Sequence, residues 1–400
     1  MTVFGYTTNF LSGVNVEWKE LGTLGEFTRG NGMQKNDFTD EGFPAIHYGQ
    51  IYTKYGLSAE ETFTFVSKEL ANKLKKAKKH DLLLATTSEN DEDLVKPLAW
   101  LGPHAAISGD MMLFRHKQNV KYLAYYFHTD AFQAEKRKYI TGAKVRRVSS
   151  RDLAKIRVPI PSPDNPEKSM AIQAEIVRIL DTFTALTAEL TAELTARKKQ
   201  YNYYRDQLLR FDEGDVKSTP LGKLAENLDS KRKPITSGLR EPGEIPYYGA
   251  SGIVDYVKDF IFDGDFLLIS EDGANLLART TPIAFSISGK SWVNNHAHVL
   301  KFETYAERRY VEYYLNSIDL APYISGAAQP KLNKNNLQNI SIPNPPLAEK
   351  ERIVAILDKF DALTSSIQEG LPREIELRRK QNAYYRELLF SFPNSEGVAA

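Results

Sequence analysis

Several features are missing from this 400-residue sequence, and cysteine is the clearest of them. Without cysteine the chain forms no disulfide, offers no thiolate to a metal and has no cysteine nucleophile. No apolar stretch approaches the roughly 20 uncharged residues that a membrane-spanning helix needs. Residues 1–12 lack the basic and apolar segments of a signal peptide. These absences predict a cytoplasmic protein without membrane contact.

A strong excess of charge of one sign is also missing, because 52 Lys and Arg face 51 Asp and Glu. The net charge is +1, whereas a protein that holds DNA by itself is usually more basic. Any nucleic-acid binding must therefore use local clusters of positive charge, or rely on partners. The composition, with 42% apolar and 26% charged residues, is ordinary for a globular protein, and the length allows about two to four domains.

A long internal repeat is the strongest positive signal in the sequence. Residues 176–187 (IVRILDTFTALT) return as residues 353–364 (IVAILDKFDALT), and nine of the twelve positions are identical. Residues 197–206 (RKKQYNYYRD) return as residues 378–387 (RRKQNAYYRE). One structural plan is therefore present twice.

Fainter matches extend the repeat upstream of these segments. The matched pairs are Leu21-Gly22 with Leu221-Gly222, Tyr48-Gly49 with Tyr248-Gly249, residues 81–84 (DLLL) with 265–268 (DFLL), Tyr125-Tyr126 with Tyr313-Tyr314, and residues 156–161 (IRVPIP) with 340–345 (ISIPNP). Between these anchors the two halves differ almost completely. A scaffold that is kept twice with a different variable surface indicates two related but different ligands.

The repeated segments have the apolar spacing of amphipathic helices. Apolar residues recur at three- and four-residue steps after each Pro-rich stretch, at residues 159–163 and 343–346. Each helical region covers about 40 residues, or about 60 Å if unbroken. Gly370 and Pro372 should kink or break the second region. Two matching long helices in a duplicated chain favour an antiparallel pair related by a pseudo-two-fold axis.

The regions before the helices are β-rich, and residues 266–269 and 283–287 predict strands. The predicted fold class is α+β, with two pseudo-symmetric, β-rich α/β domains separated by two long antiparallel helices in a coiled coil. The expected boundaries are residues 1–150 for the first domain, 151–211 for a Pro-rich junction and central helix, 212–342 for the second domain, 343–392 for the C-terminal helix and 393–400 for a tail.

Three motifs resemble the DNA specificity subunit of type I restriction-modification systems. They are SGAAQPKL at residues 325–332 with ISIP at 340–343, AEKERIV at 348–354, and the KQxxYYR segment of both copies. The tandem tetrapeptide TAEL at residues 187–194 is similar to the central helix of the IC class. The resemblance covers nearly the whole chain. The first copy departs from it at residues 144–147 (KVRR), which replace the usual Gln-Pro, so a different turn is expected there.

The resemblance implies a non-catalytic subunit, in which each of two target-recognition domains reads one half of an asymmetric, bipartite target on double-stranded DNA. It also implies that the helices set the half-site spacing and dock two methyltransferase subunits, which use S-adenosylmethionine to methylate adenine at N6. Motor-nuclease subunits would use ATP and Mg²⁺ to translocate and cut DNA. This chain itself is expected to hold no cofactor and no metal.

The motifs that could indicate chemistry in this chain are weak. Residues 344–347 (NPPL) lack the aromatic ring with which adenine methyltransferases stack a flipped base. Residues 289–291 (GKS) end like a phosphate loop, but the required earlier glycine is Ala284. His296 and His298 would share one strand face, but no neighbouring metal ligand is evident. The lack of a convincing catalytic motif favours a binding role.

Basic clusters and polar loops are the candidate DNA contacts. Lys and Arg neutralise phosphates, and short polar side chains after the two equivalent strands can read base edges. A solvated face or a plain polar turn is the alternative for each residue alone. The predicted DNA-binding residues are Lys75, Lys76, Lys78, Thr86, Thr87, Ser88, Asn90, Lys144, Arg146, Arg147, Lys231, Arg232, Lys233, Ser270, Asp272, Asn275, Gln329 and Lys331.

A second group of residues belongs to the repeated helices, where the two copies agree. Residues that recur there should meet something common to both halves, either in helix packing or in a bound partner. These residues are Leu186, Leu190, Leu194, Tyr203, Tyr204, Arg205, Phe360, Leu363, Tyr384, Tyr385 and Arg386.

Two other functions stay open at this point: a free-standing two-domain DNA-binding regulator, and a coiled-coil scaffold that joins protein partners. The nearly neutral net charge counts against the regulator. Diverged polar loops on a repeated framework count against a pure scaffold. Co-purification of a methyltransferase subunit, at two per chain, would separate the specificity subunit from both alternatives.

Overall fold

The computed structural model describes residues 11, 13–212, 214–326, 329–366 and 369–392. Three sequence predictions fall outside these residues: the tail at 393–400, most of the segment tested for a signal peptide, and Ala327-Ala328 of the SGAAQPKL motif. Among the described residues, every helix is too short or too polar to serve as a membrane span.

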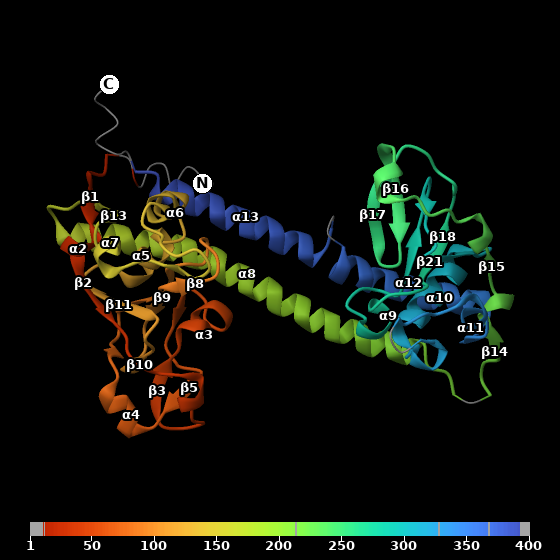
Figure 1. The fold of residues 1–400 in the computed structure, drawn as a ribbon, viewed down its shortest axis with the longest axis horizontal. Coiled ribbons are helices and arrows are strands. Elements are labelled where there is room, and N and C mark those ends of the chain that lie inside the picture. Colours follow the sequence, from red (N-terminus) through yellow and green to blue (C-terminus); the bar gives the residue numbers. More distant parts are fainter. Residues whose placement is uncertain (1–10, 12, 213, 327–328, 367–368, 393–400) are drawn as a thin grey trace. The chain divides into compact units, whose positions relative to one another are not determined.

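The chain forms two compact units, one from residues 1–189 with 375–400 and the other from residues 190–374. Helix α8 (Pro166–Leu208) is continuous over 43 residues, and it contributes its first part to one unit and its last part to the other (Figure 1). The predicted central helix is therefore present. Each unit also contains a complete β-rich domain.

The first unit contains two main sheets. The five-stranded sheet has the order β2 (Gly25–Arg29), β11 (Met111–His116), β7 (Leu82–Ala85), β9 (Lys96–Trp100) and β4 (Ser58–Ala59). The four-stranded sheet has the order β5 (Thr64–Val66), β3 (Phe43–Ile46), β10 (Ala105–Ile107) and β6 (Lys76–Ala77). All four residues of β7 are buried, which explains why this strand is a continuous apolar run rather than an alternating one.

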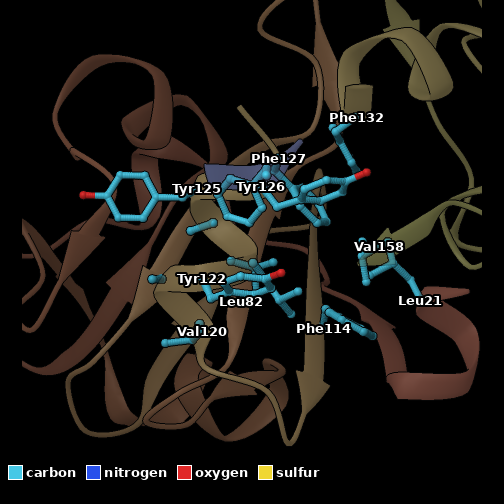
Figure 2. Close-up of a cluster of buried hydrophobic side chains, with 14 of the residues drawn as sticks. Leu21, Leu82, Phe114, Val120, Tyr122, Tyr125, Tyr126, Phe127, Phe132 and Val158 are labelled. Atoms are coloured by element: carbon cyan, nitrogen blue, oxygen red, sulfur yellow. The ribbon is translucent and has the colours of Figure 1, made fainter. Parts of the chain in front are cut away.

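Helices and sheet meet in the main core of this unit. Leu82 of β7 packs there with aromatic residues of α5 (Val120–Tyr126) and α6 (Asp130–Arg137), while Leu83 faces the opposite core. Figure 2 shows Tyr122 and Tyr126 within the cluster and the hydroxyl of Tyr125 pointing away from it. The two tyrosines therefore have different roles. The ring of Tyr126 fills the core, whereas the hydroxyl of Tyr125 reaches a polar partner.

The second unit repeats this plan. One sheet has the order β15 (Glu226–Asn227), β21 (Ala297–Lys301), β18 (Phe266–Ser270) and β19 (Ala284–Ile287), and the other has the order β17 (Gly252–Val257), β16 (Pro242–Gly249) and β20 (Trp292–Val293). Strand β18 is the equivalent of β7, and all five of its residues are buried. Strands β18 and β19 confirm the two strands predicted from the sequence.

The Pro-rich junctions are short strands rather than simple breaks. Strand β13 (Arg157–Pro161) pairs with β1 (Val16–Glu20), and β22 (Ser341–Pro343) pairs with β14 (Ser218–Pro220). Proline is tolerated there because each pair is only two strands wide, so a residue without an N–H can face outward. These ribbons close each domain at the start of its helix.

The second repeated helix is interrupted, as Gly370 and Pro372 predict. Helix α12 (Leu347–Ser365) ends before α13 (Leu371–Phe390) begins. Gly370 has φ +87°, and a Cβ there would lie 2.4 Å from the carbonyl oxygen of Ala362. The break therefore depends on glycine. The smaller helical and strand segments used below are β8 (Thr87–Ser88), β12 (Arg146–Arg147), α9 (Asn275–Ala278) and α10 (Tyr305–Ser317).

Candidate DNA interface

In the first domain, two groups of predicted DNA contacts lie side by side. Strand β8 pairs antiparallel with β12, so that Ser88 is opposite Arg146 and Thr87 is opposite Arg147. The polar loop after β7 and the basic segment that precedes the junction are thus brought together, although almost sixty residues separate them in sequence. This pairing defines a candidate reading surface with exposed positive charge at Arg147.

The basic segment is a closed turn. Thr141 and Arg147 exchange two backbone hydrogen bonds, both of 2.9 Å. Gly142 has φ +90°, and a Cβ there would lie 2.1 Å from the Val145 carbonyl oxygen, so the turn requires glycine. Lys144 is exposed at the turn.

The second domain closes the corresponding turn in the same way. Ser325 donates to the carbonyl of Lys331 over 2.9 Å and accepts from the Lys331 N–H over 2.8 Å, and Gly326 has φ +84°. Closure of both turns therefore relies on a bridge and a glycine and does not need Gln-Pro, and the expectation of a different turn at KVRR stays a prediction because residues 327–328 lie outside the described residues. Lys331 also forms a β-bridge with Asp272, in the loop after β18.

A surface hollow of about 860 Å³ lies between this loop and turn. Its lining includes three predicted DNA contacts, Asp272, Gln329 and Lys331. Leu277, on the same wall, is 57% exposed. The second domain therefore presents the same two structural parts as the first, but with a mixed polar and apolar surface in place of an arginine-rich one.

A buried ion network supports this second surface. The imidazole of His298 meets the Asp229 carboxylate at 2.6 Å through Nδ1 and the Leu332 carbonyl at 2.7 Å through Nε2. Both ring nitrogens therefore have a hydrogen-bonding partner inside the domain. Burial acts to raise the pKa of Asp229, but its hydrogen bond and proximity to His298 outweigh burial and lower it to about 2. The Asp229 carboxylate is thus held ionised.

The same network places two carboxylates beside His298, as a metal site would require. Ligand atoms of Asp229, Glu271 and His298 lie within 4.8 Å of one another, so the interpretation that no partner is near His298 was wrong. However, the Arg232 guanidinium already donates to Glu271 over 2.6 Å. Together with Lys331, 3.1 Å from Glu271, it balances the carboxylates, and the cluster is poorly suited to a metal. His296 does not share the strand face, because it precedes β21 and pairs with Asp272.

Some predicted DNA contacts are buried and lie behind the surface. Thr86 is 5% exposed and donates to the Asp110 carbonyl, and Ser270 is fully buried and donates to the Ala250 carbonyl. The Arg232 side chain is 12% exposed within its ion network. For these three residues the expectation of a direct DNA contact does not fit the structure, since their polar atoms serve the domain itself.

Other predicted contacts are exposed or organise their own loops. Asn90 donates to Asp93 over 2.9 Å, and the Asn275 carboxamide oxygen accepts from the Thr281 N–H over 3.0 Å. Lys75, Lys78, Lys231 and Lys233 are exposed, whereas Lys76 is half-buried beside the ring of Phe43. Lys76 belongs to β6, in the other sheet of the first unit, so the lysine cluster is built on a different sheet from the β7 loop.

The two domains dock onto their helices through equivalent residues. In the first unit, Tyr125 donates to Asp181 over 2.8 Å and Lys121 donates to the same carboxylate over 2.5 Å. In the second, Tyr313 and Arg309 donate to Asp358 over 2.6 and 3.0 Å. The repeated tyrosine pair predicted from the sequence is thus a docking element, and the aspartate of each repeated helix is its partner.

Within each unit, the repeated helices pack against each other through one stacked aromatic pair. In the first unit Phe183 of α8 stacks on Tyr385 of α13, with ring centroids 5.0 Å apart. In the second unit Tyr204 of α8 stacks on Phe360 of α12 at 5.8 Å. The phenylalanine of one repeat copy therefore meets the tyrosine of the other in both units, which is the exchange that an antiparallel pair predicts.

The remaining residues of the helix group divide into half-buried and exposed positions. Tyr203 and Tyr384 are 62% and 55% exposed, and each packs edge-on against its neighbouring tyrosine. The residues that are half-buried are Leu186, Leu190, Leu194, Arg205, Leu363 and Arg386. Arg205 and Arg386 each pair with the next residue in sequence, so both keep local roles.

Comparison with known proteins agrees with this architecture. The family model of the type I restriction modification DNA specificity domain matches residues 14–197 and again residues 213–377. The EcoR124I/EcoR124II specificity subunit of Escherichia coli is 35% identical over 427 residues, with all of both chains covered. The EcoprrI specificity subunit of Escherichia coli is 38% identical over 260 residues, which cover 63% of each chain.

A solved structure has the same fold. The S subunit of a type I restriction-modification system from M. genitalium superposes with a TM-score of 0.59 at 14% identity, over 96% of this chain and 98% of that one. The family match covers both repeat copies, and each copy builds a complete domain with its own candidate reading surface. The chain therefore belongs to the type I restriction-modification DNA specificity family, as a non-catalytic subunit that recognises DNA sequence.

Proposed function

We propose that this chain reads an asymmetric, bipartite target on double-stranded DNA, with one half of the target read by each domain. The observation that carries the proposal is the pairing of a polar loop with a glycine-closed turn in both domains, through β8 with β12 and through Asp272 with Lys331. The framework is equivalent in the two domains, but the side chains on it differ. Equivalent frameworks with different side chains suit two different half-sites.

The exposed residues at these surfaces fit a division of labour between phosphates and bases. Lys144 and Arg147 in the first domain supply charge that neutralises phosphates without reading sequence, whereas Lys331 in the second is exposed but already paired with Glu271. Gln329, which is exposed, and Ser88, which is half-buried, offer polar groups for base edges in the major groove. The near-neutral net charge means that partners must add to the affinity for DNA.

The partners that we propose are two methyltransferase subunits on the repeated helices and motor-nuclease subunits in the larger complex. The exposed Tyr203 and Tyr384 support two docking sites, because they lie at equivalent repeat positions in different units and have similar exposure and tyrosine contacts. S-adenosylmethionine, ATP and Mg²⁺ would belong to these partners. The chain by itself would neither methylate nor cut DNA.

Co-expression with its methyltransferase subunit tests this function. We expect a complex with two methyltransferase subunits per chain by native mass spectrometry, and methylated adenines in a single two-part sequence across a genome. A matched preparation of the chain alone should transfer no methyl group. Methylation by the chain alone, or a contiguous rather than split target, would refute the proposal.

A further inference from the structure

Behind the reading surface of the first domain lies a completely buried lysine. Lys136, in the last turn of α6, is 0% exposed. Its Nζ donates to the carbonyls of Asp91 and Leu94 over 2.8 Å each, to that of Glu92 over 3.3 Å, and to Oε1 of Gln133 over 2.5 Å. Three of these acceptors belong to the loop that follows β8. A residue that looks in sequence like part of a basic, phosphate-binding run is therefore sealed inside the domain.

The contacts of Lys136 identify it as an anchor for that loop. Burial lowers the pKa of Lys136 to about 8, so the ammonium form still dominates at neutral pH. An ammonium inside the domain needs oxygen acceptors, because an unpaired buried charge is very costly. The loop carbonyls supply them, and the loop backbone is consequently held in one arrangement.

The anchored loop is connected directly to the candidate reading surface. The Asp91 carbonyl accepts from Lys136, while the carboxylate of the same residue pairs with Arg146 of β12 at 3.0 Å. Arg146 in turn lies opposite Ser88 in the β8–β12 pair. A shift of the loop at Asp91 would therefore be transmitted to Ser88 and to Arg147, the exposed end of the pair.

The second domain anchors its loop with an arginine, and here the cation lies on the loop and its acceptors lie on the helical layer. Arg279 follows α9 in the loop after β18, and it adopts a left-handed backbone conformation with φ +49°. Its guanidinium donates to the carbonyl of Leu315 over 3.0 Å and to that of Ile318, at the end of α10. Asn275 closes the same loop through Thr281.

The two anchors connect equivalent parts of the domains without being equivalent residues. In the first domain the cation lies on the helical layer and its acceptors on the loop. In the second, the cation lies on the loop and its acceptors on the helical layer. The domains therefore meet the same mechanical requirement by separate means, which is expected if each surface must be held rigid but diverges in sequence.

From these contacts we infer that Lys136 and Arg279 are positioning residues for target recognition, each fixing the reading loop of its own domain. The inference rests on the proposed function, since it concerns how each domain holds its half-site contacts. Neither residue touches DNA in this account. Each acts through the backbone of a loop whose side chains do.

The test uses the complete methyltransferase complex and compares Lys136→Met with Lys138→Met. Lys138 is exposed and follows the same helix, so its substitution removes the same charge without disturbing the buried site. Mapping of methylated sites should show that K136M lowers discrimination in one half of the target by about ten-fold, a loss similar to that of one good base contact. The other half should be read as before, and K138M should behave as the unchanged protein.

A second variant and a second readout keep the inference open to refutation. R279M should relax the other half of the target, so the inference does not depend on the folding of K136M alone. In K136M, amide hydrogen exchange of residues 89–95 should accelerate by about ten-fold while exchange in the second unit is unchanged. Rescue by K136R of the half-site preference would support positioning by a cation.

Several results would overturn the inference. Unchanged half-site preference in both K136M and R279M would do so, as would relaxation of both halves by either variant, or equal effects of K136M and K138M. The proposed function would fail separately, and visibly, if the complex of the unchanged chain methylated no bipartite target.

Discussion

The two domains attach to their helices by the same three groups, a tyrosine, a cation and an aspartate, yet the cation differs. Among the residues that the structure describes, Lys121 in the first domain pairs with one carboxylate, that of Asp181. Arg309 in the second domain reaches Glu312, Asp358 and Asp361. The positions were kept while the number of ion pairs changed, which shows that docking geometry is the shared requirement and its electrostatic detail is not.

The histidines also differ between the domains, where His116 and His128 of the first unit are half-buried and His298 of the second is fully buried. Burial lowers the pKa of His116 and of His128 in the first unit to about 4 each, so both are neutral inside it. In the second unit the buried His298 instead has a partner at each ring nitrogen, the Asp229 carboxylate and the Leu332 carbonyl. The histidines of the first unit are thus neutral, whereas His298 is built into a network of two carboxylates and a guanidinium, so the two units should respond differently to pH.

The largest difference that we expect is in the stability lost when Lys121 or Arg309, the cations that join each domain to its helix, is removed. Arg309 is 12% exposed at its side chain, and its removal would leave Glu312, at 11%, without its cation. Breaking such a buried network costs about 3–5 kcal/mol, whereas a partly exposed pair is worth about 1 kcal/mol or less. R309M should therefore destabilise the second unit much more than Lys121→Met destabilises the first. Urea-dependent hydrogen exchange, resolved by unit, measures both; equal losses would show that the additional ion pairs contribute nothing.

The second largest difference that we expect is in how the stability of each unit depends on pH. For His116 and His128 the pKa in the folded state lies below the ordinary value of about 6.5. At mildly acidic pH the unfolded state therefore binds more protons than the folded state. Stability of the first unit is then complete above about pH 6.5 and is lost as the pH falls toward 4, by about 2 kcal/mol per histidine at pH 5.

Burial, rather than the neighbouring charged groups, fixes the sign of that effect. His116 faces Asp81 and His80, and His128 faces Arg386, Lys96 and Lys136, but burial is the largest cause of both shifts. In the second unit Asp229, with its pKa near 2, stays ionised at pH 5. Hydrogen exchange at pH 7 and 5, corrected for the intrinsic rates, should show loss of stability in the first unit only; H116Q is the control that should remove part of it.

A smaller loss of stability, equal in the two units, is expected from the stacked Phe–Tyr pair that both units contain. Replacement of Tyr204 or Tyr385 by Ala removes one stacked pair with Phe360 or Phe183, worth about 0.5–1.5 kcal/mol beyond its buried area. Assembly with the methyltransferase subunits should weaken similarly for both variants, and the sequence read should not change. Native mass spectrometry and site mapping measure the two properties; altered sequence preference in an intact complex would contradict the assignment.

The least disruptive change should be an added TAEL unit after Leu194. Four residues lengthen a helix by about 6 Å, and base pairs rise by about 3.4 Å, so the unread spacer should grow by one or two base pairs. The leucine stripe is preserved, and stability should change little because the second repeated helix is already interrupted between Ser365 and Leu371. Methylated-site maps with and without the unit decide this; an unchanged spacer would show that α8 does not set it.

Much of this framework was predictable from the sequence because repetition marks shared structure. The repeated Tyr-Tyr pair, the paired helices and the break at Gly370 all follow from local patterns that recur or from backbone rules. The position of a residue within the repeat could not show whether its side chain is buried. Ser270 and Arg232 look like surface loop residues until the structure places Ala250 and Glu271 against them.

The candidate reading surfaces were predicted only in outline for the same reason. Sequence placed polar residues after β7 and a basic segment before the junction, but their pairing through β8 and β12 depends on long-range folding. The basic run of residues 136–138 gives a further example, because the sequence alone does not show that Lys136 is the member that turns inward. Partners in space, rather than residue type, decide which cation meets DNA and which supports a loop.

Exchange of residues 16–150 for the matching domain of a relative tests the central claim most directly. The claim is that each domain reads one half of the target by itself, with the helices and the other domain unchanged. Methylated-site maps of the complex before and after the exchange should differ in one half of the target only, with the other half and the spacer length retained. A new sequence in both halves, in a complex that still assembles, would contradict the claim.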